Sequence, residues 1–87
     1  MTYRAEVDGV AVPESATAGA TSHKDAAQMV AHVNYAGQII TVEQALGGEI
    51  DRRWFEIVAD AATGQNTVTE VRKTASGNVF RLGGRDD

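Results

Sequence analysis

The chain has 87 residues, no cysteine and a formal net charge of -4 at pH 7. This length predicts a single domain over residues 1–87, and the lack of cysteine excludes disulfides and thiolate chemistry. The negative charge argues against direct nucleic-acid binding, which needs cations to displace counterions from phosphates. No stretch approaches the ~18 apolar residues of a membrane span, and the charged N-terminus does not resemble a signal peptide, so we expect a cytoplasmic protein.

The first predicted element is a half-buried strand over residues 2–8, where apolar and polar side chains alternate. Tyr3 and Val7 belong to the apolar row. Glu6 and Asp8 belong to the polar row, which we expect to face water or a partner.

A turn and a loop follow this strand. The pair Asp8-Gly9 predicts either a tight turn into a short second arm or a bulge in one continuing strand. Residues 13–21 begin with a proline and are otherwise mostly small and polar, without periodicity, which predicts a flexible loop.

The strongest helix signals lie in residues 22–37. Ser22 can cap the first free backbone amides, and Asp25 suits the positive end of the helix. Gly37 is the expected C-terminal residue. The apolar stripe that we expect to be buried consists of Ala26, Met29, Val30 and Val33.

Residues 38–46 allow two interpretations. Their β-branched residues indicate a strand, whereas Thr41 could cap a second helix that would extend through Ala61. We favour the strand, because the two glycines at 47 and 48 suit a reversal between antiparallel strands better than a helix interior.

The C-terminal half predicts an antiparallel meander. Residues 53–59 form the most apolar run, and the turn 60–64 joins them to a strand over 67–73. A second turn leads to a short strand over 79–82, and residues 83–87 should form a loose tail.

The elements together predict an α+β fold, β-α-β-β-β-β, with one helix packed on a four- to five-stranded antiparallel sheet. Besides the helical stripe, the expected core consists of Tyr3, Val7, Ile40, Val42, Phe55, Ile57, Phe80 and Leu82. Alternation sends a second apolar set to the opposite face of the sheet, namely Ile39, Trp54, Val58, Val68 and Val79. That face would be covered by residues 9–21, by a second copy or by a foreign protein.

No set of residues predicts catalysis, a cofactor or a metal. His23 and His32 fall on opposite sides of the helix and are expected at the surface, so they cannot share a metal ion. Glu6 and Asp8 lie in a solvated row without the apolar pocket that would separate their pKa values. We therefore do not expect an enzyme.

The triplet Arg52-Arg53-Trp54 is the most suggestive short motif, because arginine and tryptophan dominate the energetics of interfaces. Arg72 could join it in a basic patch. The alternative is that the arginines lie at a solvated strand end while Trp54 fills space. The predicted partner-binding residues are Arg52, Arg53, Trp54, Val58, Arg72, Glu6 and Asp8.

Two resemblances point the same way. The segment WFEIVADAATGQ, residues 54–65, resembles the strand-turn-strand ending of PepSY-type domains, small modules associated with peptidase inhibition. The layout is a strand, a helix with S-x-x-x-A-x-x-x-A-like spacing at Ser22, Ala26 and Val30, and a short meander, and it is similar to that of small phage-encoded inhibitors such as anti-CRISPR proteins. Both resemblances imply a protein that occupies another protein's surface.

The sequence thus predicts a non-catalytic protein-binding module, specifically a small inhibitor from a phage or mobile element that blocks its partner in the host cytoplasm. Its partner would be another protein or protein complex, with no membrane contact. The alternative is a structural subunit of a homo-oligomer or virion, in which a second copy covers the same face.

Overall fold

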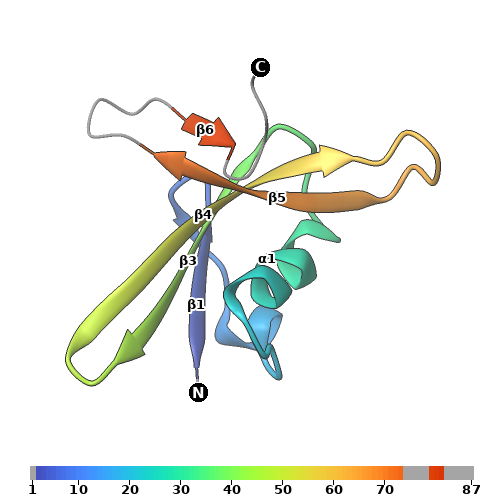
Figure 1. The fold of residues 1–87 in the computed structure, drawn as a ribbon. Helices are drawn as coiled ribbons and strands as arrows, with labels where there is room; N and C mark the ends of the chain where they lie inside the picture. The colour runs from blue at the N-terminus through green and yellow to red at the C-terminus, as the bar shows by residue number, and fades with distance from the viewer. Residues whose placement is uncertain (1, 74–78, 82–87) are drawn as a thin grey trace.

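The computed structural model describes residues 2–73 and 79–81, and it confirms the α+β class. One helix packs on an antiparallel sheet whose strand order is β2-β1-β3-β4-β5-β6 (Figure 1). The elements are β1 (Tyr3–Val7), β2 (Val10–Ala11), the 3-10 helix η1 (Glu14–Thr17), α1 (His23–Ala31), β3 (Ile39–Leu46), β4 (Glu49–Ala59), β5 (Asn66–Lys73) and β6 (Val79–Arg81). Within the described ranges, neither helix is long and apolar enough to cross a membrane.

A tight turn at Asp8-Gly9 adds the two-residue strand β2 to the edge of the sheet. Val7 pairs with Val10 across this turn, and both turn residues have positive φ, 50° and 85°. Two positive φ values in a two-residue loop are typical of a type I′ hairpin, which decides between the turn and the bulge. The Asp8 carboxylate accepts hydrogen bonds from the Ile39 amide at 3.0 Å and from Gln38 Nε2 at 3.3 Å, so it is engaged within the fold.

The segment after β2 is more regular than the expected flexible loop, because it contains η1. The Thr17 hydroxyl donates to the Tyr3 carbonyl at 2.9 Å, and the Val12 amide donates to the Ala5 carbonyl at 3.0 Å. Val12 and Ala16 also pack against the core. Residues 12–17 therefore close the outer edge of β1, where carbonyl groups would otherwise lack partners.

Helix α1 begins as predicted but ends earlier. The Ser22 hydroxyl accepts the Asp25 amide at 3.0 Å, which confirms the N-cap. The helix stops at Ala31 instead of Gly37, because Asn34 Nδ2 donates to the Val30 carbonyl at 2.8 Å and Asn66 Nδ2 donates to the Ala31 carbonyl at 2.9 Å. The expected core residue Val33 consequently lies beyond the helix and is 79% exposed.

The core fills the space between α1 and one face of the sheet. The helix contributes small residues, which let it approach the strands closely, while the sheet contributes the large ones. Among the expected core residues Tyr3, Val7, Val30, Ile40, Val42, Phe55 and Ile57 are buried, as is Ala26. The predicted core positions Phe80 and Leu82 lie outside the described side chains.

Val68 also belongs to this core, which corrects its predicted place on the opposite face. The register sets Val68 directly across from Ile57, and directly paired residues in an antiparallel sheet point to the same face. The six-residue connection from Asp60 to Gln65 determines this register.

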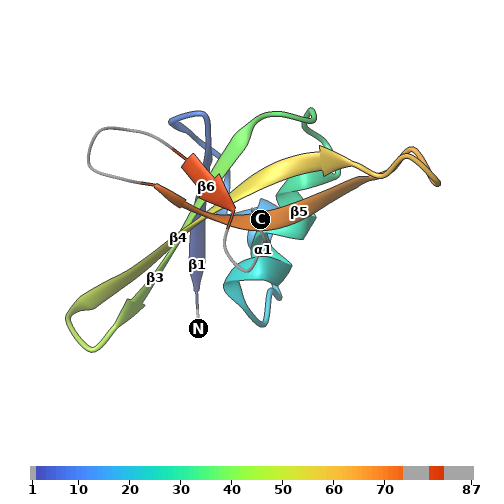
Figure 2. The same cartoon turned by 45° about the horizontal axis from the view of Figure 1, so that its top comes forward.

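The stretch that could have formed a second helix is a long hairpin of β3 and β4. Its pairing runs without interruption from Ile39 opposite Glu56 to Leu46 opposite Glu49, with the two glycines alone in the turn. Strand β4 therefore starts four residues before the predicted Arg53. The tip of this hairpin projects away from α1 (Figures 1 and 2).

Candidate partner-binding site

Strands β4 and β5 separate in the middle of the sheet. They pair from Ala59 opposite Asn66 to Trp54 opposite Val71, and β5 then continues as the partner of β6. Figure 1 shows β5 turning away from the β3–β4 hairpin beyond this point. At the separation lies a hollow of about 230 Å³, which we call the β4–β5 fork. It is lined by Asp51, Arg52, Arg53, Trp54, Glu70, Val71 and Arg72.

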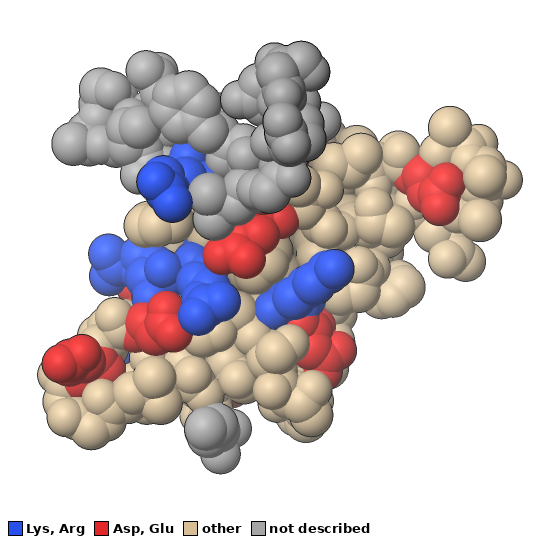
Figure 3. Space-filling view, in the orientation of Figure 1, with Lys and Arg blue, Asp and Glu red and all other residues tan. Residues whose placement is uncertain are grey.

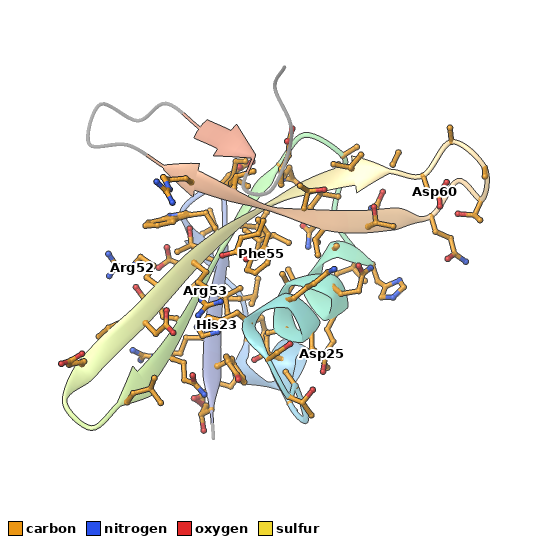
Figure 4. All side chains as sticks on the ribbon, viewed as in Figure 1. His23, Asp25, Arg52, Arg53, Phe55 and Asp60 are labelled. Carbon is orange, nitrogen blue, oxygen red and sulfur yellow. The ribbon has the colours of Figure 1, made fainter. Side chains whose placement is uncertain are left out.

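The fork brings together side chains from both faces of the sheet. Because successive strand residues point to opposite faces, Arg53 lies on the face of Phe55 and α1, whereas Arg52 and Trp54 lie on the other, outer face. Figure 4 shows Arg52 and Arg53 leaving β4 in different directions. The triplet is therefore divided between the two faces, although all three residues line the same hollow at the strand edge.

On the outer face, Arg52 belongs to a row of alternating charge. Glu43 lies between Arg4 and Arg52 in the strand register, and Arg52 Nε donates to the Glu43 carboxylate. Figure 3 shows basic and acidic side chains lying side by side over this part of the molecule. The side chain of Arg52 is still 52% exposed, although it is paired with Glu43.

On the face of α1, Arg53 forms a two-point contact with Asp51. Arg53 Nε lies 3.3 Å from Oδ1 of Asp51, and Nη2 lies 3.3 Å from Oδ2. The hydrogen bond from Arg53 lowers the pKa of the Asp51 carboxyl, and the same bond raises the pKa of Arg53. Both groups are charged near neutral pH, which holds the Arg53 guanidinium at the fork.

His23 supports this pair from the first turn of α1, which corrects its predicted surface position. The residue is 7% exposed, with Nε2 at 3.0 Å from the Asp51 carbonyl oxygen and its ring edge-on to Tyr3 at a centroid distance of 5.2 Å. The imidazole thus fastens the helix to β4. His32 is exposed, as predicted, and no cluster of the described His, Asp and Glu side chains could hold a metal ion.

Arg72 and Trp54 are the residues of the fork that remain available. Arg72 is exposed and has no ion-pair partner among the described residues. Trp54 is half-buried, between Thr41 of β3 and Val71 of β5. Within the described ranges, the fork therefore offers the guanidinium of Arg72, which has no ion-pair partner there, and the half-buried indole of Trp54.

The other predicted binding residues lie away from the fork. Glu6 shares the outer face with Trp54, because both pair with Thr41, and Val58 lies on that face four residues farther along β4. Asp8 is held in the β1–β2 turn. Sequence reasoning missed Asp51 and Glu70, whose contribution depends on the register between strands.

The outer face is less apolar than the predicted patch. Ile39, Trp54 and Val58 are half-buried there, but Glu56 and Thr69 lie between them in the register. The apolar side chains of Val12, Ala16 and Ala20 pack against the core on the side of α1. Of the segment that could have covered the outer face, Ala11, Val12 and Glu14 border the part around Glu6 and Thr41. The side chain of Val79 lies outside the described residues.

The fold and the fork define a small α+β domain with one helix on an antiparallel sheet and a hollow of mixed charge at a strand edge. Comparison of the chain with protein-family models, with curated proteins and with solved structures gives no match.

Proposed function

We propose that this protein is a non-catalytic protein-binding module that docks its partner at the β4–β5 fork. One observation carries the proposal: Trp54 and three arginines line a single hollow at the point where β4 loses its neighbour. Tryptophan and arginine are the residue types that most often dominate binding energy at protein interfaces.

The size and charge of the fork favour a protein side chain over a small molecule. Its volume of about 230 Å³ is below the ~300 to 1,000 Å³ typical of small-molecule pockets. Asp51 and Glu70 lie among the arginines, so the lining is mixed in charge and poorly suited to a polyanion. A single anchoring side chain, surrounded by polar contacts on the rim, fits this arrangement better.

The histidine–aspartate contact beside the fork argues for a structural role over catalysis. His23 is buried, its Nε2 is engaged by a backbone carbonyl and its ring packs edge-on against Tyr3, as expected of a structural histidine. The module would thus act by occupying a surface of its partner, as an inhibitor does. The two resemblances of the sequence favour this inhibitory role.

The proposal is tested by affinity purification from the native host with Trp54→Ala and Arg72→Glu variants. We expect each variant to lose most of the partner that the wild-type protein retains, since each removes an anchor of the fork. Tyr35→Ala and Lys24→Glu are matched controls, because both residues are exposed and lie away from the fork.

The variants must remain folded, which far-UV circular dichroism and a cooperative thermal transition would establish. Equal recovery of the partner by wild type and by both folded fork variants would refute the fork as the docking site. Loss of the partner with the two control variants alone would place the interface on another surface.

A further inference from the structure

We infer that the partner binds by strand addition, laying an extended, carboxylate-bearing segment along the open edge of β4 inside the fork. This inference rests on the proposed function and specifies both the geometry and the chemistry of the partner. It follows from the directions in which the backbone N–H and C=O groups of β4 point.

The backbone groups of β4 alternate between β3 and β5. The Ile57 amide donates to the Gln38 carbonyl at 3.0 Å, and the Gly37 amide donates to the Ile57 carbonyl at 2.8 Å, so residue 57 faces the β3 side. The Val58 carbonyl instead accepts the Thr67 hydroxyl of β5. Odd-numbered residues of β4 therefore hydrogen-bond toward β3 and even-numbered residues toward β5.

This alternation continues to the tip of the hairpin, because the register of β3 and β4 is unbroken from Ile39 to Leu46. The N–H and C=O groups of Ile50 and Arg52 accordingly point to the side that β5 has left. No strand in the described part of the chain pairs with them. Such an edge is a template for an added strand.

The side chains around this edge indicate which residues the added strand would carry. Arg72 contributes a guanidinium without an ion-pair partner in the described ranges, whereas Arg52 and Arg53 are paired with Glu43 and Asp51. An incoming carboxylate can bind Arg72 with a charge-assisted hydrogen bond. On the outer face, Ile50 is 56% exposed and Trp54 half-buried, so they offer apolar contacts to alternate residues of the same segment.

The opposite edge of the sheet does not offer the same template. There the Tyr3 and Ala5 carbonyls are already bonded to Thr17 and Val12, and Val7 is paired with Val10. Strand addition on β1 would have to displace these contacts, whereas no strand of the described residues pairs with β4 at Ile50 and Arg52 on the side of β5.

The test uses the intact protein and a displayed library of random linear peptides that lack tryptophan. We expect enrichment of peptides that alternate apolar residues with Asp or Glu. A synthetic copy of an enriched peptide is then titrated against the protein, with the fluorescence of Trp54 as the readout, because the chain has a single tryptophan and it lines the fork.

The decisive pair of variants is Arg52→Pro and Arg52→Ala. Both remove the guanidinium, but only proline removes the N–H that faces the open side, and proline is tolerated at an edge position whose N–H faces solvent. We expect Arg52→Pro to bind about tenfold more weakly than Arg52→Ala, the equivalent of about one backbone hydrogen bond. Arg72→Ala should likewise weaken binding about tenfold without altering the backbone.

Equal affinities of Arg52→Pro and Arg52→Ala would overturn strand addition, and the proposed function would survive if Trp54→Ala still abolished partner recovery. If the enriched peptides lacked Asp and Glu, or if no peptide were enriched, the assignment of a carboxylate-bearing ligand would be overturned.

Two further results would identify a different class of ligand. Displacement of the peptide by a single-stranded oligonucleotide would make the ligand a nucleic acid. A dimer in sedimentation that Arg52→Pro dissociates would make it a second copy of the chain, and either result contradicts the inference.

Discussion

Individual polar side chains complete the backbone hydrogen bonding wherever a strand or helix ends. The Thr17 hydroxyl bonds the Tyr3 carbonyl at the edge of β1, and Asn66 Nδ2 bonds the Ala31 carbonyl at the end of α1. Each of these side chains is supplied by a different element, so each bond also fixes how two elements pack. These residues consequently contribute more to stability than their small size suggests.

Thr17 allows this contribution to be measured. Thr17→Val preserves the shape of the side chain but leaves the buried Tyr3 carbonyl without the hydroxyl donor, so we expect a loss of about 1 to 2 kcal/mol in the free energy of unfolding. Thr67→Val is the matched control, because its hydroxyl donates to the Val58 carbonyl in an exposed setting where water can replace it. Its expected loss is below about 0.5 kcal/mol. Equal losses in urea denaturation would contradict the assigned role of Thr17.

Such single-residue roles were the least predictable part of the sequence. The helical period predicts that Ala26 and Val30 are buried, because it needs only the spacing along one element. The burial of His23 depends instead on the position of the Asp51 carbonyl, 28 residues away, which no local pattern encodes. For the same reason the position of Asn66 opposite the helix end, which stops α1 at Ala31, could not be read from the helix itself.

At the level of elements, alternation predicted each strand well but not how the strands align. It assigned Phe55 and Ile57 to the core and Trp54 to the other face, as observed. It failed for Val68, because the face of β5 follows from its register with β4, which the connection Asp60–Gln65 sets. For the same reason the fork could not be predicted from the sequence, because the residues that line it are far apart in the chain.

The open edge of β4 predicts a distinctive pattern of amide hydrogen exchange. The amides of Ile50 and Arg52, which face the side left by β5, should exchange rapidly, whereas that of Arg53, which faces β3, should be protected. The amide of Trp54 should also be protected, because it faces β5 where the two strands still pair. Nuclear magnetic resonance of the free protein would measure this pattern. Similar protection of Arg52 and Arg53 would contradict an open edge.

At the scale of the whole molecule, the projecting tip of the β3–β4 hairpin results from a mismatch of lengths. The nine residues of α1 span about 14 Å, whereas the eleven residues of β4 extend over about 36 Å. The helix therefore covers only the central part of the sheet, and the tip of the β3–β4 hairpin projects beyond it with Leu46 and Ile50 exposed. The predicted helix, with roughly 14 residues before Gly37, would be about 21 Å long and would cover more of β4.

Phe55 lies on the face of the sheet that α1 covers, whereas Trp54 lies on the other face. Replacing these two neighbouring aromatic residues should therefore change the free energy of unfolding by different amounts. Phe55 is 1% exposed under α1, and Phe55→Ala should cost about 3 to 5 kcal/mol in the free energy of unfolding. A domain of this size has a total stability of about 4 to 13 kcal/mol, so this loss would be a large fraction of the total. Trp54→Ala, which removes a larger but half-exposed ring from the other face, should cost only about 1 to 2 kcal/mol.

Thermal and urea denaturation of the two variants would measure this difference. If Trp54→Ala lowered the free energy of unfolding as much as Phe55→Ala, the indole would belong to a second hydrophobic core and could not serve as the anchor for a partner. If the loss caused by Trp54→Ala is small, the largest aromatic side chain of the protein contributes little to folding, although it lies half-exposed at the point where the described pairing of β4 and β5 ends. Its retention there would then be explained by binding, because stability would not require it.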